Sequence, residues 1–113
     1  MKFFTSSFES FADHPNSIAI SPTPPVSFEG HHIPAIAPTP DVYRKSKTNP
    51  KAAYAEFVAQ LSDVDWEEVL SELPDEGAIF LGFAEPGKFD LRRVVAKWVE
   101  HHTGEKPQEI ARR

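Results

Sequence analysis

Short apolar runs and helical stripes alternate along this chain. Phe3-Phe4-Thr5 predicts a short first strand, and the spacing of Phe8 and Phe11 predicts a helical turn within Ser7 to Asp13. Ser17 to Ser21 predicts a second, buried strand. Asp13-His14-Pro15-Asn16 is typical of a loop, and it separates the helical turn from that strand. The first twenty residues therefore predict strand, helical turn and strand.

An uninterrupted apolar run extends from Ala78 to Phe83. It is short and lies between turn signals, which is typical of a strand buried on both faces. We therefore predict a central strand over this run, with three side chains mostly buried: Ile79, Leu81 and Phe83.

Three later stretches repeat apolar residues at i, i+3, i+4 and i+7, which predicts amphipathic helices. Asn49-Pro50 should open the first, Asp65 should cap the second and Asp90 the third, which should end at Thr103-Gly104. Strands separated by long helical crossovers predict the α/β class. We expect a small Rossmann-like three-layer domain over residues 1–113, with a short, largely parallel sheet and a flexible tail at 105–113.

The segment from Pro22 to Pro50 holds seven of the eleven prolines. Proline lacks a backbone donor and fixes φ, which argues against a continuous helix or a central strand there. Six large apolar residues argue against disorder, because they need burial. We expect an ordered, extended crossover that wraps one face of the domain through Val26, Phe28, Ile33, Ile36, Val42 and Tyr43.

Composition narrows the function classes. The 113 residues contain no cysteine, which excludes disulfides, thiolate metal sites and cysteine nucleophiles. Polar residues follow Met1-Lys2-Phe3-Phe4 at once, and no apolar run approaches the roughly 20 residues of a membrane helix. We therefore expect a cytoplasmic protein with no signal peptide and no membrane association.

The net charge of −5 opposes non-specific nucleic-acid binding. Two clusters of basic residues are either local binding sites for phosphate or solvated surfaces. They are Arg44, Lys45, Lys47 and Lys51, and Lys88, Arg92 and Arg93.

The best candidate site is the loop after the 78–83 strand. Ligands of open α/β sheets bind beyond the carboxyl ends of the strands, and this strand leads into a Gly-containing loop and a helix start. Ser21 ends the other legible strand. The candidate ligand-binding residues are Ser21, Gly87, Lys88, Phe89, Asp90 and Arg92. Plain helix capping by Asp90, with Arg92 in solvent, is the alternative.

Metal and cofactor sites lack sequence support. The adjacent pairs His31-His32 and His101-His102 do not share a face, and no His-x-x-x-His spacing occurs. The chain also has no Walker-type loop, no G-x-G-x-x-G and no nucleophile elbow. We expect no metal and no cofactor.

Several landmarks resemble the short form of the family catalogued as domain of unknown function 488. The resemblance spans nearly the whole chain. The opening Phe3 to Phe8 is similar to the family's aromatic-Thr-Ser-Tyr-Phe start. The most specific piece is Pro86-Gly87-Lys88-Phe89-Asp90-Leu91-Arg92 followed by Val95-Ala96-Lys97-Trp98. Weaker landmarks are Ile18-Ala19-Ile20-Ser21, Val26 to Gly30, Ile36-Ala37-Pro38 and Glu68 to Leu73.

The resemblance implies a Rossmann-like fold and a site in the loop after the late strand, without a settled activity. The chain departs from the family there. Asp90 and Leu91 stand where the family's Cys-His-Arg triplet has Cys and His, so only Arg92 remains. A thiolate–imidazole mechanism is therefore excluded.

These observations favour a non-catalytic protein that binds a phosphate-bearing small molecule, a nucleotide or a nucleic-acid end. A small hydrolase or transferase using Asp90 with Arg92 is the enzyme alternative. A protein-interaction module, such as a small phage-type accessory factor, would use the 22–50 segment instead. For the leading hypothesis we predict that Arg92 serves binding rather than stability, because a cation in a first helical turn opposes the dipole.

Overall fold

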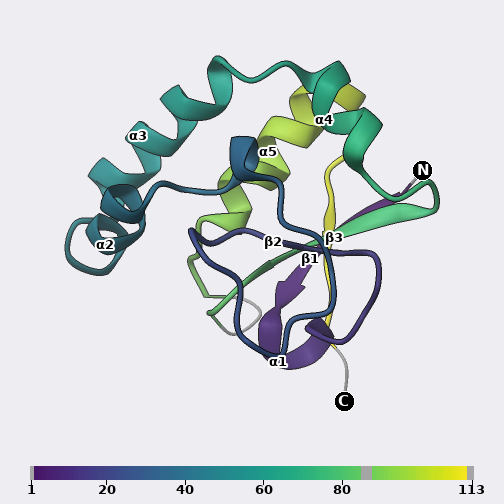
Figure 1. Cartoon of the computed structure of the whole chain (residues 1–113). Coiled ribbons are helices and arrows are strands. Elements are labelled where there is room, and N and C mark those ends of the chain that lie inside the picture. Colours follow the sequence, from purple (N-terminus) through teal and green to yellow (C-terminus); the bar gives the residue numbers. More distant parts are fainter. Residues whose placement is uncertain (1, 85–87, 112–113) are drawn as a thin grey trace.

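A parallel four-stranded sheet forms the centre of the molecule (Figure 1). The computed structural model describes residues 2–84 and 88–111. The strands lie in the order β2-β3-β1-β4, and each described pairing is parallel. The expected α/β class with a largely parallel sheet is confirmed. The strands are β1 (Lys2–Ser7), β2 (Ser17–Ala19), β3 (Gly77–Gly82) and β4 (Gln108–Glu109).

Helices cover both faces of this sheet. In Figure 1, α3, α4 and α5 lie on one side of the strands and α1 on the other. The expected three layers are therefore present. The described helices are α1 (Phe8–Phe11), α2 (Pro40–Thr48), α3 (Pro50–Ser62), α4 (Trp66–Glu72) and α5 (Arg92–Thr103), with a 3-10 helix, η1, at Pro34–Ile36.

Local chemistry sets several of these helix ends, as the sequence predicts. The side chain of Asn49 accepts the amide of Ala52, with Pro50 as the first residue of α3. Asp65 accepts the amide of Glu67 at the start of α4. Gly104 ends α5 in the left-handed conformation, with φ of 79°.

The alternation of side chains along β3 divides the core in two. Phe80 faces the larger cluster, which includes Phe57 of α3 and Val95 of α5. Ile79 and Leu81 face the smaller cluster around α1. Their predicted burial and the central position of β3 are confirmed.

The predicted burial of Phe83 is wrong. The strand ends at Gly82, so Phe83 lies in the following bend with half of its surface exposed.

The proline-rich segment is ordered against the domain but is not extended throughout. Ile33, Ile36 and Val42 are buried, as predicted, whereas Val26 is fully exposed. The expectation of an extended path is wrong for α2, although no continuous helix spans the segment. Proline is compatible with the first helical position, and the Thr39 side chain caps this helix by accepting the amide of Val42.

The predicted flexible tail contains a fourth strand. Gln108 pairs with Phe4 and Glu109 with Thr5, and the backbone amide of Ile110 donates to the carbonyl of Thr5. Ile110 also packs on the smaller apolar cluster. These contacts place β4 at the edge of the sheet beside β1.

The sheet brings the carboxyl ends of its three longer strands to one edge. Because β1, β2 and β3 are parallel, Ser7, Ala19 and Gly82 end on the same side. Ligand sites of open α/β sheets lie at this edge. None of the helices within residues 2–84 and 88–111 is long and apolar enough to cross a membrane.

The docking of the proline-rich segment can be tested through one side chain. Ile36 is fully buried in the larger cluster, so Ile36→Ala should lower the free energy of unfolding by about 2–5 kcal/mol. Val26→Ala in the same segment should change it by less than about 0.5 kcal/mol. Urea unfolding measures both. Equal midpoints for the two variants would show that the segment is not held through Ile36.

Candidate functional site

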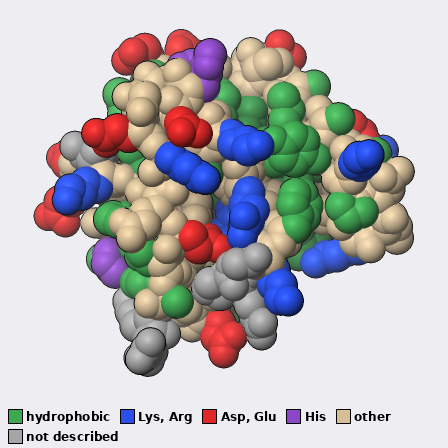
Figure 2. All heavy atoms as spheres, turned by 180° about the vertical axis from the view of Figure 1, so that it is seen from behind, with side chains coloured by type: hydrophobic (Ala, Val, Ile, Leu, Met, Phe, Trp, Pro, Cys, Tyr) green, Lys and Arg blue, Asp and Glu red, His purple; other side chains and the backbone are tan. Residues whose placement is uncertain are grey.

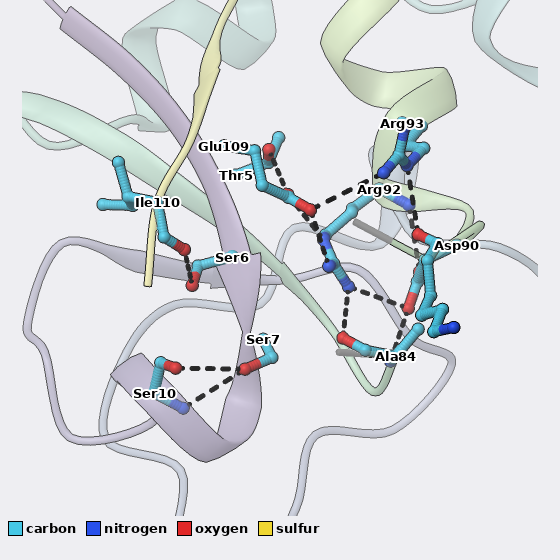
Figure 3. Close-up of polar contacts among 11 residues, drawn as sticks. Thr5, Ser6, Ser7, Ser10, Ala84, Asp90, Arg92, Arg93, Glu109 and Ile110 are labelled. Atoms are coloured by element: carbon cyan, nitrogen blue, oxygen red, sulfur yellow. Dashed lines mark hydrogen bonds and ion pairs between the residues drawn. The ribbon is translucent and has the colours of Figure 1, made fainter. Parts of the chain in front are cut away.

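The guanidinium of Arg92 is buried at the start of α5 and surrounded by acceptors (Figure 3). Its Nε and Nη2 donate to the two carboxylate oxygens of Glu109, each at 3.1 Å. Its Nη1 donates to the carbonyl of Ala84 at 2.9 Å and to Asp90 Oδ2 at 3.1 Å. Two carboxylates therefore offset the cation, which the helix dipole disfavours at this position.

Glu109 connects this cation to the sheet. Thr5 of β1 donates its hydroxyl proton to Glu109 Oε1 at 2.6 Å, and the side chain of Thr5 is itself buried. Arg93 approaches Glu109 Oε2 at 3.8 Å from the solvent side. The carboxylate of β4 thus joins β1 to the first turn of α5.

Asp90 closes the loop between β3 and α5. Its Oδ2 accepts the amide of Ala84 at 2.8 Å and its Oδ1 accepts the amide of Arg92 at 3.1 Å. A Cβ at Gly82 would lie 2.2 Å from Asp90 Oδ1, so only glycine leaves room for this carboxylate. The predicted contact of Asp90 with the helix start is present, although Leu91 is the residue that precedes the helix.

The structure brings Asp90 and Arg92 together as a structural pair. The sequence predicts that Arg92 contacts either an external anion or solvent. Both predictions are wrong, because its side chain has no exposed surface and contacts Asp90 and Glu109. The expectation that Arg92 adds nothing to stability is therefore corrected. A buried cation held by two carboxylates of its own chain leaves a large penalty when the pair is broken.

The other predicted site residues lie in different environments. Lys88 and Phe89 are exposed, and Gly87 lies outside the described residues. Ser21, predicted to end the second strand, is buried two residues after β2, and its hydroxyl donates to the carbonyl of Thr23 at 2.8 Å. Ser21 does not line the cavity beside Phe89.

A cavity of about 260 Å³ opens at the carboxyl edge, between the end of β3 and α2. Three aromatic rings line it, from Tyr43, Phe83 and Phe89. Phe83 is 50% exposed and Phe89 is 45% exposed, although both are large and apolar. The remaining lining residues are Ser46, Lys47, Ala84, Asp90 and Leu91.

Contacts within the lining hold its rings and its cation. The ring centroid of Phe83 lies 4.6 Å from that of Phe8 and 6.2 Å from that of Tyr43. Lys47 places its amine 5.0 Å from the centroid of Tyr43. The cavity therefore combines aromatic faces with one lysine, and the carboxylate of Asp90, which also lines it, is paired with Arg92.

The sequence prediction missed Tyr43, Ser46 and Phe83 as members of this site. The sequence pattern predicts Tyr43 and Phe83 as core residues, because both have large aromatic side chains and lie next to apolar residues. Lys47 is predicted in a basic cluster, but only the position of α2 brings it to the end of β3. The i, i+3, i+4 relation of Tyr43, Ser46 and Lys47 places them on one helix face, and this spacing is the signal that was available.

Metal binding finds no support in the described part of the chain, where no three His, Cys, Asp or Glu side chains gather. No protein-family model matches this chain, and no curated protein or solved structure matches it either.

The role of Arg92 can be measured directly against its neighbour. Arg92→Ala leaves the carboxylates of Glu109 and Asp90 without their main partner, so the free energy of unfolding should fall by about 3–5 kcal/mol. Arg93→Ala removes the same charge from a side chain that is 43% exposed, and should cost no more than about 1 kcal/mol. Thermal and urea unfolding check both values. An Arg92→Ala protein as stable as the parent would contradict a structural role for the buried pair.

Proposed function

We propose that this protein binds a nucleotide-like ligand, a planar ring that carries phosphate, at the carboxyl edge of its sheet, and that it does so without catalysis. The observation that carries the proposal is the pair of half-exposed rings, Phe83 and Phe89, beside the amine of Lys47. This combination supplies a stacking surface and a counter-charge for one ligand.

The exposed rings support a stacking role because exposing them has a cost. Full burial of a large apolar side chain stabilises by on the order of 1.5–3 kcal/mol, and a ligand that covers these half-exposed rings would recover roughly half of that for each. Phe83 is held against Phe8 and Tyr43, so its face is preorganised. A rigid aromatic surface loses little conformational freedom when it binds.

The charges of α2 support Lys47 as the ligand's counter-ion. Arg44 forms an ion pair with Asp41, and Lys45 contacts Glu56 at 2.6 Å. Lys47 has no carboxylate partner among the described residues, and its amine lies over the ring of Tyr43 instead. It is therefore the cation of this helix that a phosphate would meet at the cavity.

The size of the cavity supports one ring system inside, with phosphate at the rim. A volume of about 260 Å³ lies near the lower limit for ligand pockets, which commonly hold 300–1,000 Å³. A larger groove of about 460 Å³ lies between α3 and α5, but its lining is mainly apolar, and neither Lys47 nor the exposed rings of Phe83 and Phe89 line it. The carboxyl-edge cavity is therefore the better candidate.

The alternative functions receive less support. Both oxygens of Asp90 accept hydrogen bonds from backbone amides, and one also binds Arg92, which gives this carboxylate a structural task. In the 22–50 segment Val26 is fully exposed, but Ile33, Ile36 and Val42 are buried, so these residues form no extended apolar patch. The resemblance to domain of unknown function 488 stays a prediction.

A ligand screen with two variant pairs tests the proposal. Nucleoside monophosphates should raise the melting temperature, whereas inorganic phosphate alone should not. Phe89→Ala should weaken the bound nucleotide by about 1–3 kcal/mol, or roughly 5- to 150-fold, because one stacking face is lost. Isothermal titration measures this affinity, with Val26→Ala as the control for loss of an exposed apolar side chain.

The charge is tested in the same way. Lys47→Gln should weaken nucleotide binding, and Lys51→Gln, an equal change at an exposed position outside the cavity, should not. Nucleotide binding that survives both Phe89→Ala and Lys47→Gln would remove the carboxyl-edge cavity from the function.

A further inference from the structure

Aromatic and cationic side chains continue beyond the carboxyl-edge cavity along α5. From this arrangement we infer that the natural ligand is a single strand of nucleic acid, which places one base in the cavity and lays its following phosphates along α5. The inference rests on the proposed nucleotide site and extends it to a polymeric ligand.

The first link in this surface is aromatic. Phe89, at the rim of the cavity, lies 6.3 Å from the ring of Tyr54 on α3, measured between centroids. Lys97 of α5 places its amine 5.6 Å from the centroid of Tyr54. A ring and a cation therefore follow directly after Phe89, which repeats the pairing of Tyr43 with Lys47 in the cavity.

The second link is cationic. Lys97, Arg93 and Lys106 line one cavity of about 430 Å³, together with Thr5 and the short strand β4. Figure 2 shows a face of the molecule on which Lys and Arg side chains gather near the middle, with Asp or Glu side chains among them and a strip of hydrophobic side chains beside them. Arg93 is joined to the loop of the first site, because its Nε donates to the carbonyl of Lys88 at 3.1 Å.

Two of these cations are available to an outside anion. Lys97 and Lys106 are exposed and have no carboxylate partner in the described part of the chain. Glu109 forms short contacts to the buried Arg92 and only a 3.8 Å contact to Arg93. Glu109 is therefore paired with the buried Arg92, and the exposed amines of Lys97 and Lys106 remain available to a ligand.

The alternation of rings and cations fits a single strand better than other polyanions. Single-stranded sites combine a basic track for phosphates with aromatic rings on which successive bases stack. A duplex hides its base faces, and the acidic side chains of a peptide carry no flat rings to cover Phe83, Phe89 and Tyr54. The net charge of −5 limits the attraction to this local track, so binding should be sensitive to salt.

A length series separates a strand from a mononucleotide. Affinity for oligothymidylate should rise at least tenfold from one to about four nucleotides and then level off, as the track fills. The double variant Lys97→Gln/Lys106→Gln should lose most of this gain and keep the mononucleotide affinity. For this variant, the slope of log K against log salt concentration should become shallower by about 1.4, because each of the two lost phosphate contacts contributes roughly 0.7.

A charge-matched control guards against a general electrostatic effect. Arg44→Gln/Lys51→Gln removes two positive charges from α2 and α3 outside both cavities, and should bind the four-nucleotide strand like the parent. Polyglutamate and duplex DNA serve as competing polyanions. Both should compete at least tenfold less well than the single strand.

The outcomes distinguish the two proposals. Mononucleotide binding that depends on Phe89 but does not strengthen with length would overturn the strand and leave the nucleotide site standing. Loss of the length gain in the control double variant, or equal competition by polyglutamate or duplex, would also overturn the strand. Mononucleotide binding that is unchanged in both Phe89→Ala and Lys47→Gln would instead remove the proposed nucleotide site.

Discussion

The buried guanidinium of Arg92 is the constraint on which the rest of this site depends. A fully desolvated cation in the first turn of a helix is stable only when carboxylates surround it. Glu109 and Asp90 meet this need from two sides, one from β4 and one from the loop after β3. The requirement fixes where α5 begins, holds the last strand beside β1 and ties Ala84 to the residues that follow Phe89.

This arrangement separates buried charges from exposed ones. Asp90, Arg92 and Glu109 form hydrogen bonds and ion pairs with one another at the carboxyl end of β3. Their charges therefore stabilise the fold. Lys47 and Lys97 lie farther out and contact aromatic rings rather than carboxylates. The most conspicuous arginine of the sequence motif is therefore part of the scaffold, and the surface it supports presents lysines and rings to a ligand.

Local signals predicted much of the fold. Asn49-Pro50, Asp65 and Gly104 act within one or two helical turns of themselves, so the sequence alone reveals the helix ends that they form. The uninterrupted apolar residues of β3 likewise predict that this strand is buried. Each of these inferences needs only neighbours in sequence, and each is confirmed.

The missed features depend on contacts between distant parts of the chain. β4 is two residues long and is held by the pairing of Glu109 with Thr5, 104 residues away. No period of two or 3.6 can show so short a strand. Phe83 shares the apolar character of β3 but follows its last residue, and α2 begins at a proline that looks like a loop signal.

The candidate site itself was predicted only in part. Its place after β3 follows from the rule for parallel sheets, and Phe89 is one of the residues that the sequence predicts there. The membership of Tyr43 and Lys47 depends on how α2 packs, which local pattern does not encode. The burial of Arg92 depends on Glu109, whose position becomes clear only when the sheet is complete.

The position of Glu109 also bears on how the chain folds during synthesis. Until this residue has left the ribosome, Arg92 lacks the carboxylate that binds it through two nitrogens, and burying it would be costly. The helices α2 to α4 can pack earlier, because their caps and apolar stripes are already present. The start of α5 and the rim that carries Phe89 should therefore adopt their final form later than α2 to α4.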